Sequence, residues 1–301
     1  MSKKVTWAVV AAAVAVGIIL AAGLSRVSAP KRIEAAGDRE TPPRRIIPMA
    51  PNIVETVFAL GAGDRVVGVS DYTAFPPEAK AKPAVGALFN PDLERITALA
   101  PDLVIIQDHH ARVEELCRTR GIGLLSVNMA RVGSILAGVE ILGRRLGTEA
   151  RAQEIIAGIR RDLDAVRARV AGKPRLKVLI CVDRTPGTLK NLFTVGRDSF
   201  LAEMVDIAGG ESIFNDVARD YFEPSAEEIV MRKPDVVIEM RPGQFADAES
   251  QQKLIADWNA LSTLPAVREK RVYVLTDDFI VVPGPRVGLI AERLAAVVHP
   301  E

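Results

Sequence analysis

A duplicated segment constrains the fold of this chain more than any other feature of its sequence. FNPDLERITALAPDLVII fills residues 89–106, and FEPSAEEIVMRKPDVVIE fills residues 222–239. Aligned without gaps, the two segments share the pairs Phe89/Phe222, Pro91/Pro224, Glu94/Glu227, Ile96/Ile229, Pro101/Pro234, Asp102/Asp235, Val104/Val237 and Ile105/Ile238. Packing and turns explain most of these residues, since most are apolar or prolines. The shared glutamates, Glu94 and Glu227, need a further explanation.

Helices and strands alternate on both sides of this duplication. Continuous apolar runs such as DLVIIQ and PDVVIEM are typical of buried strands, and stretches such as NIVETVFALG and PSAEEIVMRK have helical spacing. Residues 64–70, DRVVGVS, are expected as a short strand, and Pro91 is expected in the first turn of a helix. Because strands that alternate with helices form parallel sheets, the sequence predicts an α/β fold with two similar parallel-sheet lobes.

Residues 133–171 form a nearly unbroken helical pattern between the two halves. Apolar side chains recur every three or four residues, at Ile155, Ile159, Leu163, Val166 and Val170. A long helix is a stiff connector, so we expect little hinge motion between the lobes. We therefore predict an N-terminal α/β lobe at residues 44–132, a bridging helix region at 133–172 and a C-terminal α/β lobe at 173–301.

The amino terminus carries a segment of a different kind. Residues 5–24, VTWAVVAAAVAVGIILAAGL, hold no charge and are long enough to cross a bilayer as a helix. The basic Lys3 and Lys4 would keep the start of the chain cytoplasmic, so the remainder would be periplasmic or otherwise extracytoplasmic. Residues 1–25 are therefore expected to be a signal peptide or a membrane anchor, and residues 26–43 a linker. No cysteine follows the apolar run, which argues against the lipoprotein type of anchor.

Composition and short motifs exclude several function classes. The net charge of +1 gives no global attraction to nucleic acid. The two cysteines, Cys117 and Cys181, lie in different halves without a CxxC spacing, so we expect buried free thiols. The chain has no GxSxG, Walker or HExxH motif, and Gly61-Ala62-Gly63 precedes a strand pattern instead of opening a helix. We therefore expect neither an enzyme nor a bound cofactor.

Several stretches, taken in order, resemble the class III periplasmic substrate-binding proteins of ABC importers, which carry cobalamin, haem and iron–siderophores. They are PNIVETVFALGAGDRVVGVSDYTAFPPEAK and NPDLERITAL in the first half, and LFTVGRDSFLAEMVDIAGG, EPSAEEIVMRKPDVVI and TDDFIVVPGPRV in the second. The likeness covers about residues 44–299, and its first-half stretches are most similar to the cobalamin-binding branch. The resemblance implies two α/β lobes joined by a helix, with the ligand in an inter-lobe cleft where loops leave the carboxyl ends of the strands.

The resemblance also gives Glu94 and Glu227 a role. Members of the family carry one surface glutamate on each lobe, and these dock onto arginines of the permease dimer, which works with its ATPase subunits. A twofold permease needs one charge per lobe at equivalent positions. Interaction with the helix dipole, which contributes about 0.3–1 kcal/mol per carboxylate, is the alternative explanation, and both can hold.

We expect a set of loop side chains to face the ligand, namely Tyr72, Leu88, Phe89, His109, Phe193, Tyr221 and Phe279. A large flat macrocycle suits aromatic walls with few polar anchors. The resemblance suggests that Tyr72, Leu88 and Tyr221 face a corrinoid. The family pattern has tryptophan where this chain has Leu88, so one stacking wall is absent.

Histidines and arginines in the same loops are compatible with ligands other than a corrinoid. A zinc site is not expected, since the only histidine besides His109 and His110 is His299, but one of the pair or Tyr72 could ligate haem iron. Four loop arginines could bind siderophore oxygens: Arg184, Arg197, Arg241 and Arg286. Pairing with local acids such as Asp183 and Asp278, which is worth little at a surface, is the alternative.

These observations predict an extracytoplasmic binding protein that captures cobalamin or a related corrinoid and delivers it to an ABC permease. Haem or an iron–siderophore is the alternative ligand within the same class. Two readings from other classes are a chelatase-like tetrapyrrole enzyme that uses His109 or His110, and a membrane-tethered sensor. The repeated glutamates favour transport over sensing, and the apolar amino terminus argues against chelatase chemistry.

Overall fold

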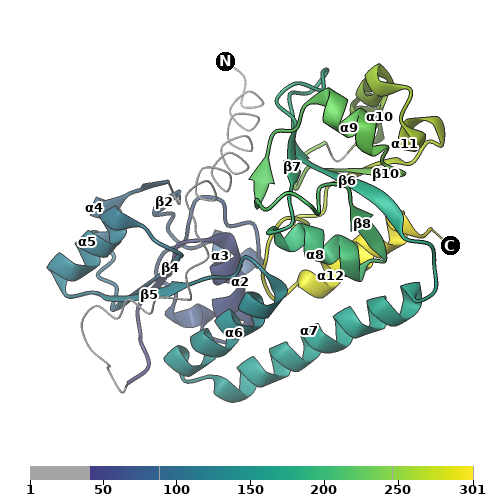
Figure 1. Ribbon diagram of the computed structural model, residues 1–301. Coiled ribbons are helices and arrows are strands. Elements are labelled where there is room, and N and C mark those ends of the chain that lie inside the picture. Colours follow the sequence, from purple (N-terminus) through teal and green to yellow (C-terminus); the bar gives the residue numbers. More distant parts are fainter. Residues whose placement is uncertain (1–40, 88, 246, 301) are drawn as a thin grey trace. The chain divides into compact units, whose positions relative to one another are not determined.

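The computed structural model describes residues 41–87, 89–245 and 247–300, which form two compact α/β units (Figure 1). The N-terminal unit contains the described residues up to 160 together with Val282–Pro285. The C-terminal unit contains residues 161–281 and the described residues from Arg286 onward. The chain passes from one unit to the other within helix α7 (Glu149–Val170).

The N-terminal unit is built on a parallel sheet of strand order β1–β4–β5. Its strands are β1 (Ile46–Pro48), β2 (Gly86–Ala87), β3 (Asn90–Pro91), β4 (Leu103–Gln107) and β5 (Gly123–Val127). Its helices are α2 (Pro51–Ala59), α3 (Pro77–Lys80), α4 (Leu93–Ala98), α5 (Ala111–Arg120) and α6 (Val132–Leu146), with a 3-10 helix at Gly63–Arg65. Side chains of α4 and α5 join those of β1 and β4 in one buried cluster, which explains the continuous apolar run of β4.

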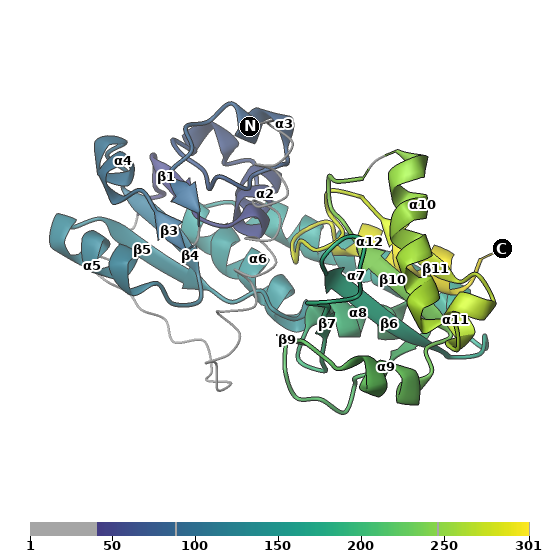
Figure 2. The same ribbon diagram turned by 90° about the horizontal axis from the view of Figure 1, so that it is seen from above.

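The C-terminal unit is built on a mixed sheet of strand order β11–β10–β6–β7–β9, with β8 beside β6. Its strands are β6 (Leu176–Asp183), β7 (Phe193–Val195), β8 (Gly210–Ser212), β9 (Tyr221–Phe222), β10 (Val236–Met240) and β11 (Val272–Leu275). Its helices are α8 (Phe200–Ile207), α9 (Ala226–Arg232), α10 (Ala248–Asp257), α11 (Pro265–Arg268) and α12 (Val287–Val298), with a 3-10 helix at Trp258–Leu261. Helices α8 and α12 lie together on one face of the sheet and α9, α10 and α11 on the other (Figures 1 and 2).

The α/β class and the parallel pairing expected from the sequence are confirmed at the centre of each sheet. Strands β1, β4 and β5 are parallel, as are β6, β10 and β11. Strands β7 and β9 add antiparallel pairs that the sequence pattern did not indicate. Both cysteines are buried free thiols, as expected, and burial raises the pKa of Cys117 to about 12.

The duplicated segment plays the same structural part in each unit. Strand β4 pairs with β1, and its counterpart β10 pairs with β6. The shared aspartate before each strand ties it to its neighbour: the Asp102 carboxylate accepts from the backbone N–H of Arg44 and Arg45 at 2.8 and 3.0 Å. In the second copy, Asp235 accepts from the N–H of Lys177 at 2.9 Å. These bonds explain why an acid recurs at this position.

Three local expectations were wrong. Residues 64–70 do not form a strand, because Gly63–Arg65 turns in a 3-10 helix and only isolated bridges at Val66 and Val69 pair with neighbours. Pro91 lies in β3, and the Asp92 side chain caps α4 by accepting from the N–H of Arg95. The expected helix over 133–171 is two helices, because Gly147 takes a left-handed φ of 68° and ends α6.

The amino-terminal segment at residues 1–25 and most of the linker at 26–43 lie outside the described residues. Among the helices that the structure does describe, none combines the length and the apolar character needed to cross a bilayer.

Candidate functional site

Two segments of the N-terminal unit meet at the carboxyl ends of β1 and β4. Asn52, which follows β1 and is almost fully buried, donates through Nδ2 to Oε1 of Gln107 at 2.8 Å. The same amide donates to the carbonyl of Pro283 at 3.3 Å. The bonds hold these two segments and the returning segment Val282–Pro285 in one place, as expected for parallel strands that end at the same edge.

The turn that carries Tyr72 is fixed to the hairpin that carries Phe89. Asp71 exchanges two hydrogen bonds with Gly86, since its Oδ1 accepts from the Gly86 N–H at 3.0 Å and its own N–H donates to the Gly86 carbonyl at 3.2 Å. Tyr72 is half-buried, whereas Phe89 lies at the turn between β2 and β3 and is 46% exposed. Leu88 lies outside the described residues.

The two histidines have different local roles. His110 caps α5, with Nδ1 accepting from the N–H of Val113 at 3.4 Å. Nδ1 of His109 lies 2.5 Å from Oε1 of Glu114, yet the His109 side chain remains 68% exposed. Within the described part of the chain, no group of three or more histidine, cysteine, aspartate or glutamate side chains is placed to hold a metal. His109 is therefore the more accessible of the pair for contact with a ligand.

In the C-terminal unit, Phe193 lies in β7 and Tyr221 in β9, and the pairing of these strands places Tyr221 opposite Val195. Both aromatic side chains are half-buried, and the Tyr221 hydroxyl is hydrogen-bonded with the side chain of Ser199. Burial raises the pKa of Tyr221 to about 12, with Asp220 adding to the shift and the Ser199 bond opposing it. At neutral pH this phenol keeps its proton, so its ring, and not a phenolate, is what it can offer to a ligand.

Phe279 lies half-buried in the loop after β11. The guanidinium of Arg286 is 5.4 Å from the centre of its ring, and Nη1 of Arg286 is 2.8 Å from Oδ1 of Asp278. Arg286 is therefore paired with a local acid, which is one of the two roles that the sequence left open for the loop arginines.

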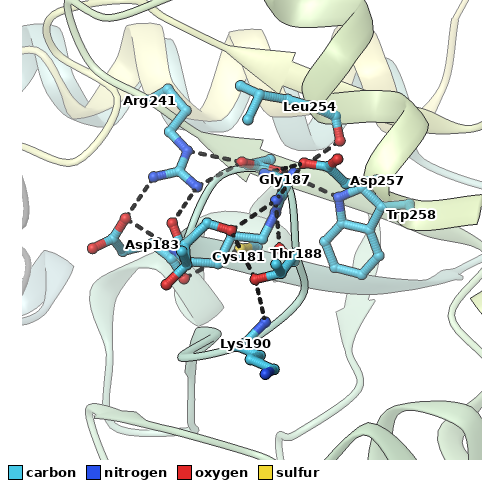
Figure 3. A network of polar contacts seen from close by, with 12 residues as sticks. Cys181, Asp183, Gly187, Thr188, Lys190, Arg241, Leu254, Asp257 and Trp258 are labelled. Carbon is cyan, nitrogen blue, oxygen red and sulfur yellow. Dashed lines mark hydrogen bonds and ion pairs between the residues drawn. The ribbon is translucent and has the colours of Figure 1, made fainter. Parts of the chain in front are cut away.

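A buried network of charged side chains occupies the carboxyl end of β6 and β10 (Figure 3). Glu239 lies between two arginines, with Oε2 2.9 Å from Nη2 of Arg184 and Oε1 2.8 Å from Nη2 of Arg241. Trp258 donates its indole N–H to Glu239 at 3.1 Å. Outer carboxylates complete the network, since Arg184 contacts Asp257 at 2.8 Å and Arg241 contacts Asp183 at 2.5 Å.

The network corrects one expectation and confirms another. Arg241 pairs with Asp183, in agreement with the alternative of local pairing, but the side chains of Arg184 and Glu239 are 0% exposed, so these are buried ion pairs and not weak surface ones. The fourth loop arginine, Arg197, lies 3.8 Å from Asp198. Glu239 was missed by the sequence analysis, although a glutamate inside the apolar run VVIEM signals a buried charge that needs partners.

The repeated glutamates have equivalent places in their helices. Glu94 is the second residue of α4 and Glu227 the second residue of α9, and both are exposed. Other side chains cap the two helices: Asp92 accepts from the N–H of Arg95 in α4, and Ser225 accepts from the N–H of Glu228 in α9. No hydrogen bond or ion pair reaches the carboxylate of Glu94 or Glu227 from residues 41–87, 89–245 and 247–300. Both carboxylates lie in the first turn of their helices, where the interaction of a negative charge with the helix dipole is favourable.

The described residues thus form two α/β units, each built on a sheet with parallel strands at its centre. Residues 46–279 match the family model described as periplasmic binding protein, and the chain belongs to that family. A vitamin B12-binding protein of Vibrio parahaemolyticus is 28% identical over 247 residues, which cover 81% of this chain and 86% of the relative. An uncharacterized ABC transporter substrate-binding lipoprotein of Bacillus subtilis, YvrC, is 28% identical over 267 residues, covering 86% of this chain and 81% of the relative.

Solved structures give the same picture of the fold. The vitamin B12-binding protein BtuF of Vibrio cholerae superposes with a TM-score of 0.71 at 24% identity, covering 85% of this chain and 97% of that one. The haem-binding protein RhuT of Roseiflexus superposes with a TM-score of 0.70 at 25% identity, covering 84% and 97%. The expected class III architecture is thus confirmed.

Proposed function

We propose that this protein is the extracytoplasmic binding component of an ABC importer and that its ligand is cobalamin or a related corrinoid. The observation that carries the choice of ligand is the pairing of the loop arginines. Arg184, Arg197, Arg241 and Arg286 each have a carboxylate partner. An anionic ligand would have to displace those partners, which is costly where the pairs are buried.

The chemistry of the candidate ligands then favours the corrinoid. A corrin ring carries neutral amides around its edge, whereas haem carries propionates and ferric catecholate siderophores are anionic. The buried network joins two arginines to three carboxylates, Asp183, Glu239 and Asp257, and so adds no positive charge for an anion. Aromatic rings at Tyr72, Phe89 and Phe279 supply the apolar surface that a large macrocycle requires.

Haem is the second candidate, and one observation favours it. The exposed His109 could reach haem iron as an axial ligand, whereas Tyr221 is protonated and tied to Ser199. The short contact between His109 and Glu114 would then orient the imidazole, as carboxylates do for many metal-bound histidines.

Delivery to the permease is assigned to Glu94 and Glu227. Each is exposed on its own unit and available for an arginine of a permease subunit. The apolar segment at residues 5–24 would export the chain and, where it is not cleaved, anchor it to the cytoplasmic membrane. No bond is made or broken by the protein in this proposal, and the ATPase subunits supply the energy.

A binding panel tests the proposal. The full chain, purified in detergent, is titrated by calorimetry with cyanocobalamin, haemin and a ferric catecholate siderophore. We expect cyanocobalamin to bind with a Kd of about 1 μM or tighter, a value that corresponds to about 8 kcal/mol. Failure of all three to bind would refute the function, and preference for haemin or for the siderophore would overturn the corrinoid assignment.

Two loop variants and one matched control locate the ligand. Tyr72→Ala and Phe279→Ala should each weaken cyanocobalamin binding by about tenfold, because each removes aromatic stacking area. Leu289→Ala is the control, since Leu289 is also an apolar side chain and is 45% exposed, but lies on α12 outside the loops. Equal affinities of all three variants would show that these loops do not hold the ligand.

A further inference from the structure

The two helices that carry the repeated glutamates present different surfaces. The alignment of residues 89–106 with 222–239 places Ala98 of α4 opposite Met231 of α9. Each lies four residues after its glutamate, so it shares the glutamate's face of the helix. Met231 is 71% exposed, the highest value among the exposed large apolar side chains of the described residues. Ala98 is exposed as well but offers only a methyl group.

The charges around the two glutamates also differ. Exposed carboxylates of Glu223 and Glu228 flank Glu227. In α4, the position of Glu228 is taken by Arg95, which donates to the carbonyl of Ala84 at 2.9 Å. Asp92, the exposed cap of α4, has the neutral Ser225 at its matching position, so the carboxylates near the helix start are Asp92 and Glu94 in α4 and Glu223, Glu227 and Glu228 in α9. The α9 surface is therefore the more acidic of the two, and a partner with basic side chains would bind it more strongly.

The two cations next to Met231 offset only part of this acidity, because Lys233 is exposed whereas Arg232 is paired with Asp216. Arg232 forms two hydrogen bonds to the Asp216 carboxylate, at 2.7 and 2.9 Å, and its guanidinium lies 4.5 Å from the centre of the Phe214 ring. Glu228 is held in place by the capping box with Ser225, so the helix start is rigid. Met231 itself is flexible and polarizable, which suits an irregular apolar hollow.

From these differences we infer that α9 is the stronger of two unequal docking surfaces and that Met231 is its apolar anchor. The partner is a permease subunit that presents a basic side chain one helical turn from an apolar hollow. The carboxylate of Glu227 fixes the basic side chain, and burial of Met231 excludes water from the ion pair. The inference rests on the proposed transport function, and adds to it an unequal division of affinity between the two units.

The test measures binding to the purified cobalamin-type ABC permease–ATPase complex of the source organism, held in nanodiscs, by biolayer interferometry. Met231→Ser should weaken binding by about tenfold, because truncating an interface anchor has an effect of that order. Ala98→Ser is the matched control at the equivalent position and should leave the affinity within about twofold. Glu227→Gln should weaken binding more than Glu94→Gln. Thermal melting and cyanocobalamin binding of each variant should match the unmodified chain, since all four positions are exposed.

The outcomes separate this inference from the proposal beneath it. Equal effects of Glu94→Gln and Glu227→Gln, or an unchanged affinity for Met231→Ser, would overturn the unequal docking while leaving transport intact. No binding of the unmodified chain to the permease complex, with or without cyanocobalamin, would refute the transport function and the inference with it.

Discussion

Replacing Glu239 by glutamine tests whether the buried network supports the C-terminal unit. The glutamate accepts from Arg184 Nε at 3.0 Å, from Arg241 Nε at 2.8 Å and from Trp258 Nε1 at 3.1 Å. A glutamine has the same shape but turns an N–H₂ group toward these donors and removes the charge between two buried guanidinium groups. Breaking a buried ion pair from one side costs about 3–5 kcal/mol.

That cost is a large part of the usual free energy of unfolding, which is about 5–15 kcal/mol for a domain. We expect Glu239→Gln to lower the free energy of unfolding of the C-terminal unit by about 3–5 kcal/mol. Urea unfolding followed by tryptophan fluorescence measures it, because Trp258 belongs to the network and the only other tryptophan, Trp7, can be replaced by phenylalanine.

The matched control is Glu249→Gln. Glu249 also pairs with a cation, Lys253 at 2.7 Å, but both side chains are at least 74% exposed. An exposed pair of this kind contributes about 0.3–0.5 kcal/mol. If Glu239→Gln costs no more than Glu249→Gln, the network does not stabilise the unit and the argument that its arginines are fully committed fails.

Three further predictions concern transport, acidity and packing. The double variant Glu94→Lys, Glu227→Lys should abolish cobalamin uptake in cells while cyanocobalamin binding by the purified chain is unchanged; normal uptake would refute docking. Burial lowers the pKa of His299 below its ordinary 6.5, so the unfolded chain binds the proton more readily. Stability should therefore fall as the pH drops below about 6.5, and His299→Gln should flatten this slope in urea titrations. Gly196→Ala should cost about 1–3 kcal/mol, because a Cβ there meets the carbonyls of Arg219 and Val217, whereas Gly133→Ala, with open space, should not destabilise.

Local patterns in the sequence were sufficient to predict the α/β architecture of this protein. The alternation of helix and strand predicted the α/β class, and the duplicated segment predicted that one helix and one strand would play equivalent parts in the two units. The exposed positions of Glu94 and Glu227 follow from the same pattern, because helical spacing places Ile96 and Ile229 toward the core and the glutamates away from it. Such features depend on neighbours within a turn or two, which a sequence displays directly.

Element boundaries were less well predicted, since they depend on competition between local groups. Pro91 is compatible with a helix start, but Asp92 is the better cap and accepts the hydrogen bond from Arg95. Gly147 ends α6 in the middle of a helical pattern because glycine adopts a positive φ without a steric penalty. Either outcome was consistent with the spacing of apolar residues alone.

What the sequence determined by itself is therefore the periodicity: which stretches are helices and strands, which faces are apolar, and that the chain repeats itself. Only the tertiary structure decided which charges meet. Arg184 and Glu239 are 55 residues apart in sequence, and Arg184 and Asp257 are 73 apart. No local spacing relates such residues, because parallel strands bring them together only after the sheet has formed. Only the tertiary structure therefore shows whether a loop arginine is available to a ligand or already paired with a carboxylate. In this protein the arginines are paired, and the proposed choice of ligand rests on that pairing.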